Sequence, residues 1–188
     1  MASGAEPPST AFRVRLARFA IATTTAAALF ATASFGLDDL GFDRPAVAAG
    51  ELWRLATCHV THLDIRHALT NAVGTGLVTA ILLEFHRLPT VLGSAAAIAA
   101  VISAASLALF GESNHAGFSG VLYGLATMAA FGLAARSPWL AVIVAVALVA
   151  GIITAFFGWS RPWAADVAVH THVCGMATGA AIGSWRRL

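Results

Sequence analysis

Three groups of polar residues in this chain have side chains that could carry out acyl transfer. Ser119 lies in the sequence Gly117-Phe118-Ser119-Gly120, and its hydroxyl could attack a carbonyl carbon if a neighbouring base accepted its proton. His172 is a candidate for that base. His67 and Asn71 are four residues apart, so they would project from one helical face and could both donate hydrogen bonds to a developing oxyanion. This chemistry requires that the fold bring the three groups together.

The composition indicates a polytopic membrane protein of the all-α class. Of the 188 residues, 59% are hydrophobic and 11% are charged, and the mean hydropathy is +0.80. Ordinary soluble domains carry about 25% charged residues. Six spanning helices of ~20 residues would use about 120 residues, which leaves short loops and one longer loop. The chain has no basic stripe interleaved with aromatic residues, so we expect no nucleic-acid partner.

The hydrophobic runs predict six membrane helices that form one domain over residues 12–188. Residues 1–11 are small, polar and proline-containing, and we expect them to form a disordered cytoplasmic tail. We expect a structured, partly embedded loop over residues 37–66. The predicted helices cover residues 19–35, 67–83, 90–110, 119–135, 138–157 and 167–185. The first run follows three arginines and also fits a cleavable signal peptide, an alternative that the sequence leaves open.

Arginines predict the orientation of these helices, because basic residues are enriched in cytoplasmic loops. With the N-terminus inside, more arginines lie on the inner side than on the outer side. The inner set is Arg13, Arg15, Arg18, Arg87, Arg136, Arg186 and Arg187, and the outer set is Arg44, Arg54, Arg66 and Arg161. We therefore expect both termini in the cytoplasm. The helices that begin near His67, Ser119 and His170 would then all start at the outer side, so the polar groups meet at one depth.

Glycine spacing gives two of these helices a reason to pack closely. Small residues at four-residue spacing form a stripe that lets another helix approach. The stripes are Gly175, Gly179 and Gly183 after His172, and Gly120 and Gly124 after Ser119. Close contact along these stripes would bring Ser119 within hydrogen-bond reach of a histidine on the last helix.

A Ser–His dyad is the catalytic arrangement that these positions predict. His172 would accept the Ser119 proton and later return it to the leaving amine. The Ser119 backbone N–H, His67 and Asn71 would hold the oxyanion. A third member of a triad is not evident, because Asp166 lies six residues before His172, a poor offset for bonding its ring.

Four motifs occur in order from Glu51 to the end of the chain. They are Glu51-x-Trp53-Arg54, then His62 with His67-x-x-x-Asn71, then Gly117-x-Ser119-Gly120 with Tyr123, and finally His172-x-x-Gly175-x-x-x-Gly179. Together they resemble the rhomboid family of intramembrane serine proteases. The resemblance implies a six-helix bundle in the lipid bilayer that cleaves membrane-anchored protein substrates. It also implies that Glu51 and Arg54 are structural, that Tyr123 packs beside the catalytic histidine, and that His172 rather than His170 is the base.

The short chain and the sequence of residues 117–124 most resemble those of the rhombosortase subset of bacterial rhomboids. This resemblance implies an inner-membrane location, a periplasmic active site and cleavage near a C-terminal glycine-containing sorting tag on exported proteins. The alternative from a different class is a catalytically silent rhomboid-like protein that binds membrane clients. It would need the fold but not the dyad.

Some of these residues also have structural explanations. Ser119 could simply cap its helix. His59 and His62 are spaced like metal ligands, but no carboxylate or cysteine completes the set, so we expect no metal and no cofactor. Cys58 and Cys174 allow one disulfide, although thiols in apolar contexts are commonly inert. Because hydrolysis needs water, we also expect a polar cavity at Ser119 that opens to the outer side.

Overall fold

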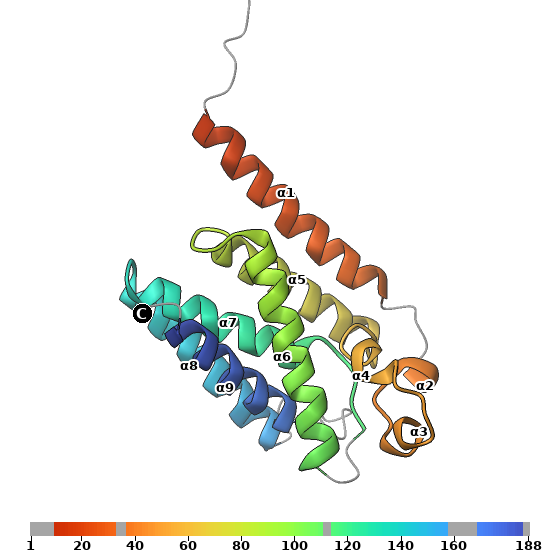
Figure 1. Cartoon of the computed structure of the whole chain (residues 1–188). Coiled ribbons are helices and arrows are strands. Elements are labelled where there is room, and N and C mark those ends of the chain that lie inside the picture. Colours follow the sequence, from red (N-terminus) through yellow and green to blue (C-terminus); the bar gives the residue numbers. More distant parts are fainter. Residues whose placement is uncertain (1–9, 33–36, 111–113, 158–168, 186–188) are drawn as a thin grey trace, which may run out of the picture.

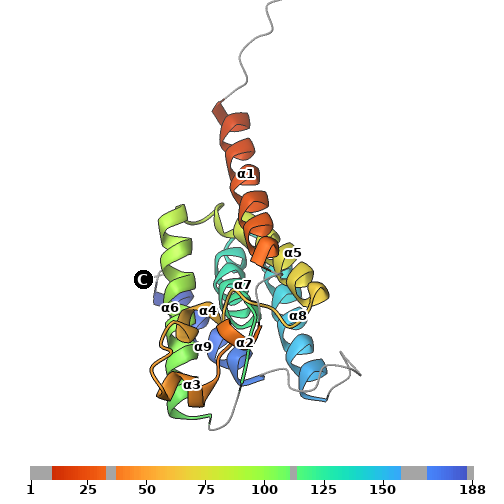
Figure 2. The same ribbon diagram turned by 90° about the vertical axis from the view of Figure 1, so that its right-hand side faces the viewer.

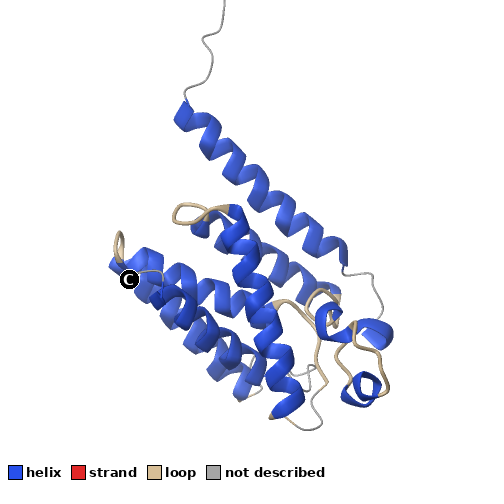
Figure 3. Cartoon of the chain, viewed as in Figure 1, coloured by secondary structure: helices blue, strands red, loops and turns tan. Residues whose placement is uncertain are grey.

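The computed structural model describes residues 10–32, 37–110, 114–157 and 169–185, so most of the predicted tail and Asp166 lie outside the described residues. Within these ranges the chain forms helices α1 (Thr10–Ala31), α2 (Leu37–Leu40), α3 (Arg44–Ala48), α4 (Arg54–Thr57), α5 (Ile65–Leu82), α6 (Leu88–Ala108), α7 (Ser119–Ala134), α8 (Pro138–Phe156) and α9 (Val169–Trp185). The described residues form no β-strand (Figure 3), which confirms the predicted all-α class.

Helix α7 occupies the centre of the bundle. It packs against α5, α6, α8 and α9, whereas α1 lies along α5 and projects beyond the other helices (Figure 1). Helices α6 and α8 flank α7 on opposite sides (Figure 2). The core between these helices is aliphatic and includes Leu82, Ile98, Ile102, Val121 and Met128.

The observed long helices follow the predicted hydrophobic runs closely, except at the N-terminus. Five of them have ends within two residues of the predicted ones. Helix α1 starts at Thr10 instead of residue 19, because arginine is a good helix former and the three arginines before the apolar run continue the helix. Thr10 and Ala11, which we had assigned to the tail, therefore belong to α1.

Three described helices are long and apolar enough to cross a membrane by length and composition, namely α1, α6 and α8. Helix α7 is apolar but has only 16 residues. In α8 only 6% of the hydrophobic window is buried inside the protein, so this helix offers an almost continuous apolar surface to lipid.

The first loop (residues 37–64) is held by hydrogen bonds from side chains of α4 and of the residue before it. The Arg54 guanidinium is buried, donates from Nε to the Glu51 carboxylate at 2.6 Å, and donates from Nη1 to the Gly41 carbonyl at 2.9 Å. Trp53 Nε1 donates to the Asp39 carbonyl at 3.3 Å. These bonds tie α4 and the residue before it to α2 and to the residue that follows α2, so the loop is structured as predicted.

Helices α7 and α9 touch through backbone because glycines face each other across the contact. A methyl group on Gly175 would overlap the Gly120 carbonyl oxygen, and one on Gly179 would overlap the Gly124 carbonyl oxygen. Because glycine has no side chain, the two backbones can approach each other closely at these positions. This contact sets the distance between the first turns of the two helices.

Candidate active site

Ser119 and His172 lie within hydrogen-bond distance of each other. Ser119 is the first residue of α7, and His172 lies in the first turn of α9. The Ser119 Oγ and the His172 Nε2 are 2.9 Å apart. His172 is buried and Ser119 is partly exposed. The pair therefore has the spacing of a nucleophile and its base.

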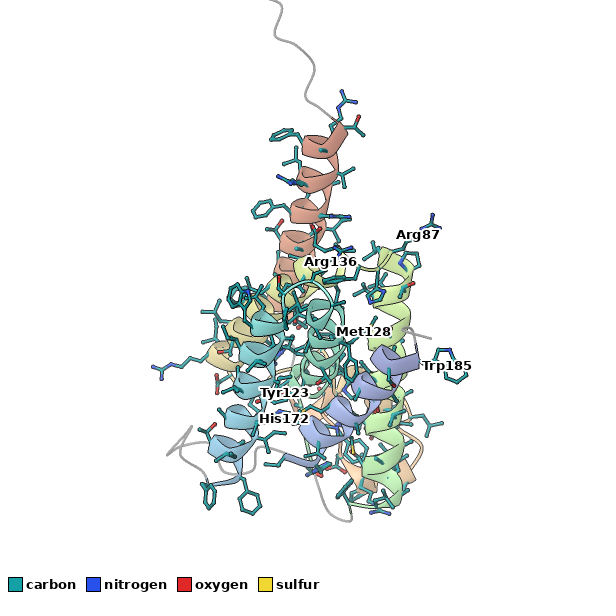
Figure 4. The ribbon with its side chains drawn as sticks, turned by 90° about the vertical axis from the view of Figure 1, so that its left-hand side faces the viewer. Arg87, Tyr123, Met128, Arg136, His172 and Trp185 are labelled. Atoms are coloured by element: carbon teal, nitrogen blue, oxygen red, sulfur yellow. The ribbon has the colours of Figure 1, made fainter. Side chains whose placement is uncertain are left out.

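Tyr123 fixes the plane of the His172 ring. It lies one turn after Ser119 on α7, and the two rings stack with centroids 4.2 Å apart and an interplanar angle of 1° (Figure 4). The Tyr123 hydroxyl lies against α8, where a side chain on Gly151 would overlap it. The imidazole is thus held between its hydroxyl partner and an aromatic face.

His67 and Asn71 face the backbone immediately before Ser119. A side chain built on Gly117 would come within 2.7 Å of the His67 Nε2 and 3.5 Å of the Asn71 Nδ2. Gly117 also has a φ of 121°, which favours glycine, so both space and conformation require glycine here. Both polar side chains are buried, and Asn71 Nδ2 has no hydrogen-bond partner among the described residues.

Helix capping sets the position of this pair. The Asp64 carboxylate accepts a hydrogen bond from the His67 backbone N–H at 2.7 Å and caps the start of α5. His67 and Asn71 then follow on one face of α5, as their spacing predicted. The His62 ring meets the His67 ring edge-on, with centroids 5.2 Å apart.

The remaining predicted residues lie around this site rather than in it. Glu51, Trp53 and Arg54 belong to the first loop and hold its fold. Cys58 and Cys174 are both free thiols. The described residues contain no group of three or more histidine, cysteine, aspartate or glutamate side chains that could hold a metal ion.

A cavity of about 220 Å³ lies beside the first loop. It is lined in part by Phe42, Arg54 and His115 and does not include Ser119. The expected cavity around Ser119 is therefore not this one. Ser119 itself is partly exposed.

Sequence reasoning did not bring together three histidines next to the site, because no spacing along the chain relates His115 to His59 or to His170. His115, four residues before Ser119, has ring contacts with His59 of the first loop and with His170 of α9. Burial lowers the pKa of His115 to about 3, and the neighbouring His59 and His170 also lower it. Burial lowers the pKa of His59 to about 4. Both rings are therefore neutral at physiological pH.

Comparison with protein families identifies the family to which this chain belongs. The family model for the rhomboid domain matches residues 49–187, which is most of the chain. The chain belongs to the rhomboid family, as the motifs indicated. Rhomboids are generally intramembrane serine proteases that act on membrane-protein substrates within the bilayer, and this chain is an integral membrane protein. No curated protein matches the sequence significantly.

Proposed function

We propose that the protein is an intramembrane serine endopeptidase in which Ser119 and His172 form the catalytic dyad. The observation that carries this proposal is the 2.9 Å distance between Ser119 Oγ and His172 Nε2 in a chain of the rhomboid family. Partial exposure of Ser119 supports its role as nucleophile, and burial of His172 under the Tyr123 ring supports a fixed base.

The reaction proceeds in two halves. His172 Nε2 accepts the Ser119 proton while Oγ attacks the scissile carbonyl carbon, and the protonated imidazole then gives that proton to the leaving amine. Water next attacks the acyl-enzyme, with His172 as base, and releases the new carboxyl terminus and the free serine.

Three donors stabilise the oxyanion that forms in each half. The Ser119 N–H lies at the first position of α7, where backbone N–H groups lack partners within the helix and attract negative charge. His67 and Asn71 add side-chain donors from the other side of Gly117. Asn71 supports this role most directly, because its Nδ2 has no partner among the described residues.

We propose six spanning helices in one domain that begins with α1, with both termini cytoplasmic and the site facing the periplasm. The long helices α1, α6 and α8 supply apolar surface to lipid, and α5, α7 and α9 carry the polar site between them. A substrate helix must unwind before cleavage, because its carbonyls are otherwise bound in its own hydrogen-bond ladder. Glycine weakens helices, so a rhombosortase-like target near a glycine-containing C-terminal sorting tag fits this requirement.

A fluorophosphonate probe tests the proposal without a known substrate, because it reacts with activated serines. We expect purified wild-type protein in detergent to be labelled and Ser119→Ala to be inert. His172→Ala should lower the labelling rate on the order of 10⁴-fold or more. Ser184→Ala is the matched control, because Ser184 is exposed near the far end of α9 and its hydroxyl donates to the Ala181 carbonyl.

Three outcomes would contradict this assignment. Unchanged labelling of Ser119→Ala would show that another serine reacts. Loss of labelling in His170→Ala but not in His172→Ala would show that His170, and not His172, is the base. A folded wild-type protein that is not labelled at all would favour the catalytically silent protein that binds membrane clients.

A further inference from the structure

His115 lies at the centre of an aromatic cluster that touches the segments of both dyad residues. Its ring stacks on Phe42 of the first loop, with centroids 4.6 Å apart and an interplanar angle of 18°. The His170 ring meets it edge-on at 5.8 Å, and the His59 ring is tilted toward it at 6.2 Å. The first loop and α9, which are distant in sequence, therefore converge on this one side chain.

The backbone on either side of this ring is also pinned to the first loop. The Phe42 N–H donates to the His115 carbonyl at 2.9 Å, and the His115 N–H donates to the Phe42 carbonyl at 3.3 Å. The Gly117 N–H donates to the Cys58 carbonyl at 2.8 Å. The residues that lead into Ser119 are thus attached to the first loop at two points before α7 begins.

On the other side, His170 anchors the first turn of α9. Its ring stacks on Phe110, with centroids 4.4 Å apart, and its Nε2 lies 3.4 Å from the Ser106 hydroxyl of α6. His170 is two residues before His172. A shift of the His115 ring would therefore move both the segment that carries the nucleophile and the turn that carries the base.

We propose that His115 is a positioning residue that sets the Ser119–His172 geometry by packing its ring between Phe42 and His170. This inference rests on the proposed protease function. The ring face and edge make the contacts, because both ring nitrogens are buried without a hydrogen-bond partner among the described residues. A phenyl ring should therefore preserve the packing that the imidazole provides, whereas a methyl group should not.

The test compares His115→Phe and His115→Ala by the saturation kinetics of fluorophosphonate labelling. For His115→Ala we expect the maximal labelling rate to fall on the order of tenfold to a hundredfold, since small misplacements of reacting groups have effects of this size. The probe concentration at half-maximal rate should change by less than about twofold, since binding is untouched. His115→Phe should recover the rate to within about threefold of wild type. Rates are normalised to folded protein from unfolding curves.

His86→Ala is the matched control, because His86 precedes α6 while the cluster lies at the other end of that helix. Wild-type rates in His115→Ala, or a rate in His115→Phe as low as in His115→Ala, would overturn the inference. If His115→Ala does not fold, Phe42→Leu removes the stacking partner instead, and an unchanged maximal rate there would equally overturn it. Labelling of wild type but not of Ser119→Ala keeps the protease proposal intact in each of these cases. If the wild-type protein is not labelled, both the protease proposal and the positioning role of His115 are contradicted.

Discussion

At the scale of single residues, the buried amide of Asn71 is the feature that most requires a functional explanation. A buried donor without a partner costs about 1–3 kcal/mol, and native structures rarely keep one without a reason. Asn71 is 3% exposed, and its Nδ2 faces the backbone at Gly117, where the reacting carbonyl oxygen would lie. An oxyanion that forms only during the reaction would supply the missing partner.

We predict that Asn71→Leu, which is close in volume but has no donor, slows fluorophosphonate labelling about 10²-fold. The unfolding midpoint should stay the same or rise, because an unpaired polar group has been replaced by an apolar one. Thr75→Val is the matched control: Thr75 lies one turn further along α5, is buried, and has a hydroxyl without a partner among the described residues. An equal loss of labelling in both variants would contradict the oxyanion role.

At the scale of helices, the α7–α9 contact decides whether the dyad can form. Ser119 and His172 lie in the first turns of two helices whose backbones meet at Gly120, Gly124, Gly175 and Gly179. Any side chain at this contact separates the helices along their whole length, because packed interiors do not absorb extra volume. If Ser119 and His172 form the proposed dyad, catalytic geometry and helix packing are therefore coupled.

We predict that Gly179→Ala lowers the free energy of unfolding by about 1–3 kcal/mol and also slows labelling of Ser119. Gly93→Ala is the matched control, because Gly93 is also helical but has open space where a methyl group would lie. It should be neutral or stabilise by up to about 1 kcal/mol, as expected for alanine in a helix. Chemical unfolding in detergent measures both changes. Similar effects of the two substitutions would contradict a tight α7–α9 contact.

The α7–α9 contact also shows which parts of the molecule can be predicted from the sequence. The approach of α7 to α9 was predictable because glycine spacing is a local pattern that reports one face of one helix. The pair His67 and Asn71 was predictable for the same reason. The helices α2 to α4 were not, because they are four or five residues long and are held by bonds such as Arg54 to the Gly41 carbonyl.

The partners of His115 could not be predicted from the sequence for a related reason. Its contacts join Phe42, His59 and His170, which lie 73, 56 and 55 residues away, so no spacing along the chain records them. Side-chain types alone also do not distinguish a histidine that packs by its ring from one that binds a ligand. The catalytic roles of Ser119 and His172 stay predictions until labelling tests them.

At the scale of the whole molecule, the distribution of charge agrees with the proposed orientation. Arg18 forms an ion pair with Glu84 at 2.6 Å, and Arg136 lies over the Phe85 ring and donates to the Glu84 carbonyl. Arg87 lies at the same end of the bundle as Arg136 (Figure 4). Basic residues of three separate segments thus gather at the end opposite Ser119, where positive-inside topology puts the cytoplasm.

The helices that carry the site are less suited to lipid than those around them. Helices α5, α7 and α9 have 18, 16 and 17 residues, and all three contain polar site residues. Helix α7 touches four other helices, so protein rather than lipid surrounds most of its length. Polar side chains are tolerated at membrane depth when they face such an interior. Six spans are therefore compatible with only three helices that are long and hydrophobic enough on their own.

This topology predicts opposite accessibility at the two ends of α7. In a background without Cys58 and Cys174, Asn114→Cys and Ala135→Cys would each introduce one exposed thiol, before and after the helix. We expect a membrane-impermeant maleimide to label Asn114→Cys in cells with an opened outer membrane, and Ala135→Cys only after lysis, because α7 runs from the periplasm to the cytoplasm in the proposed topology. The reverse pattern would mean that the protein has the opposite orientation in the membrane, with Ser119 at the cytoplasmic side. Labelling of both positions in unlysed cells would mean that α7 does not cross, which excludes the six-span arrangement.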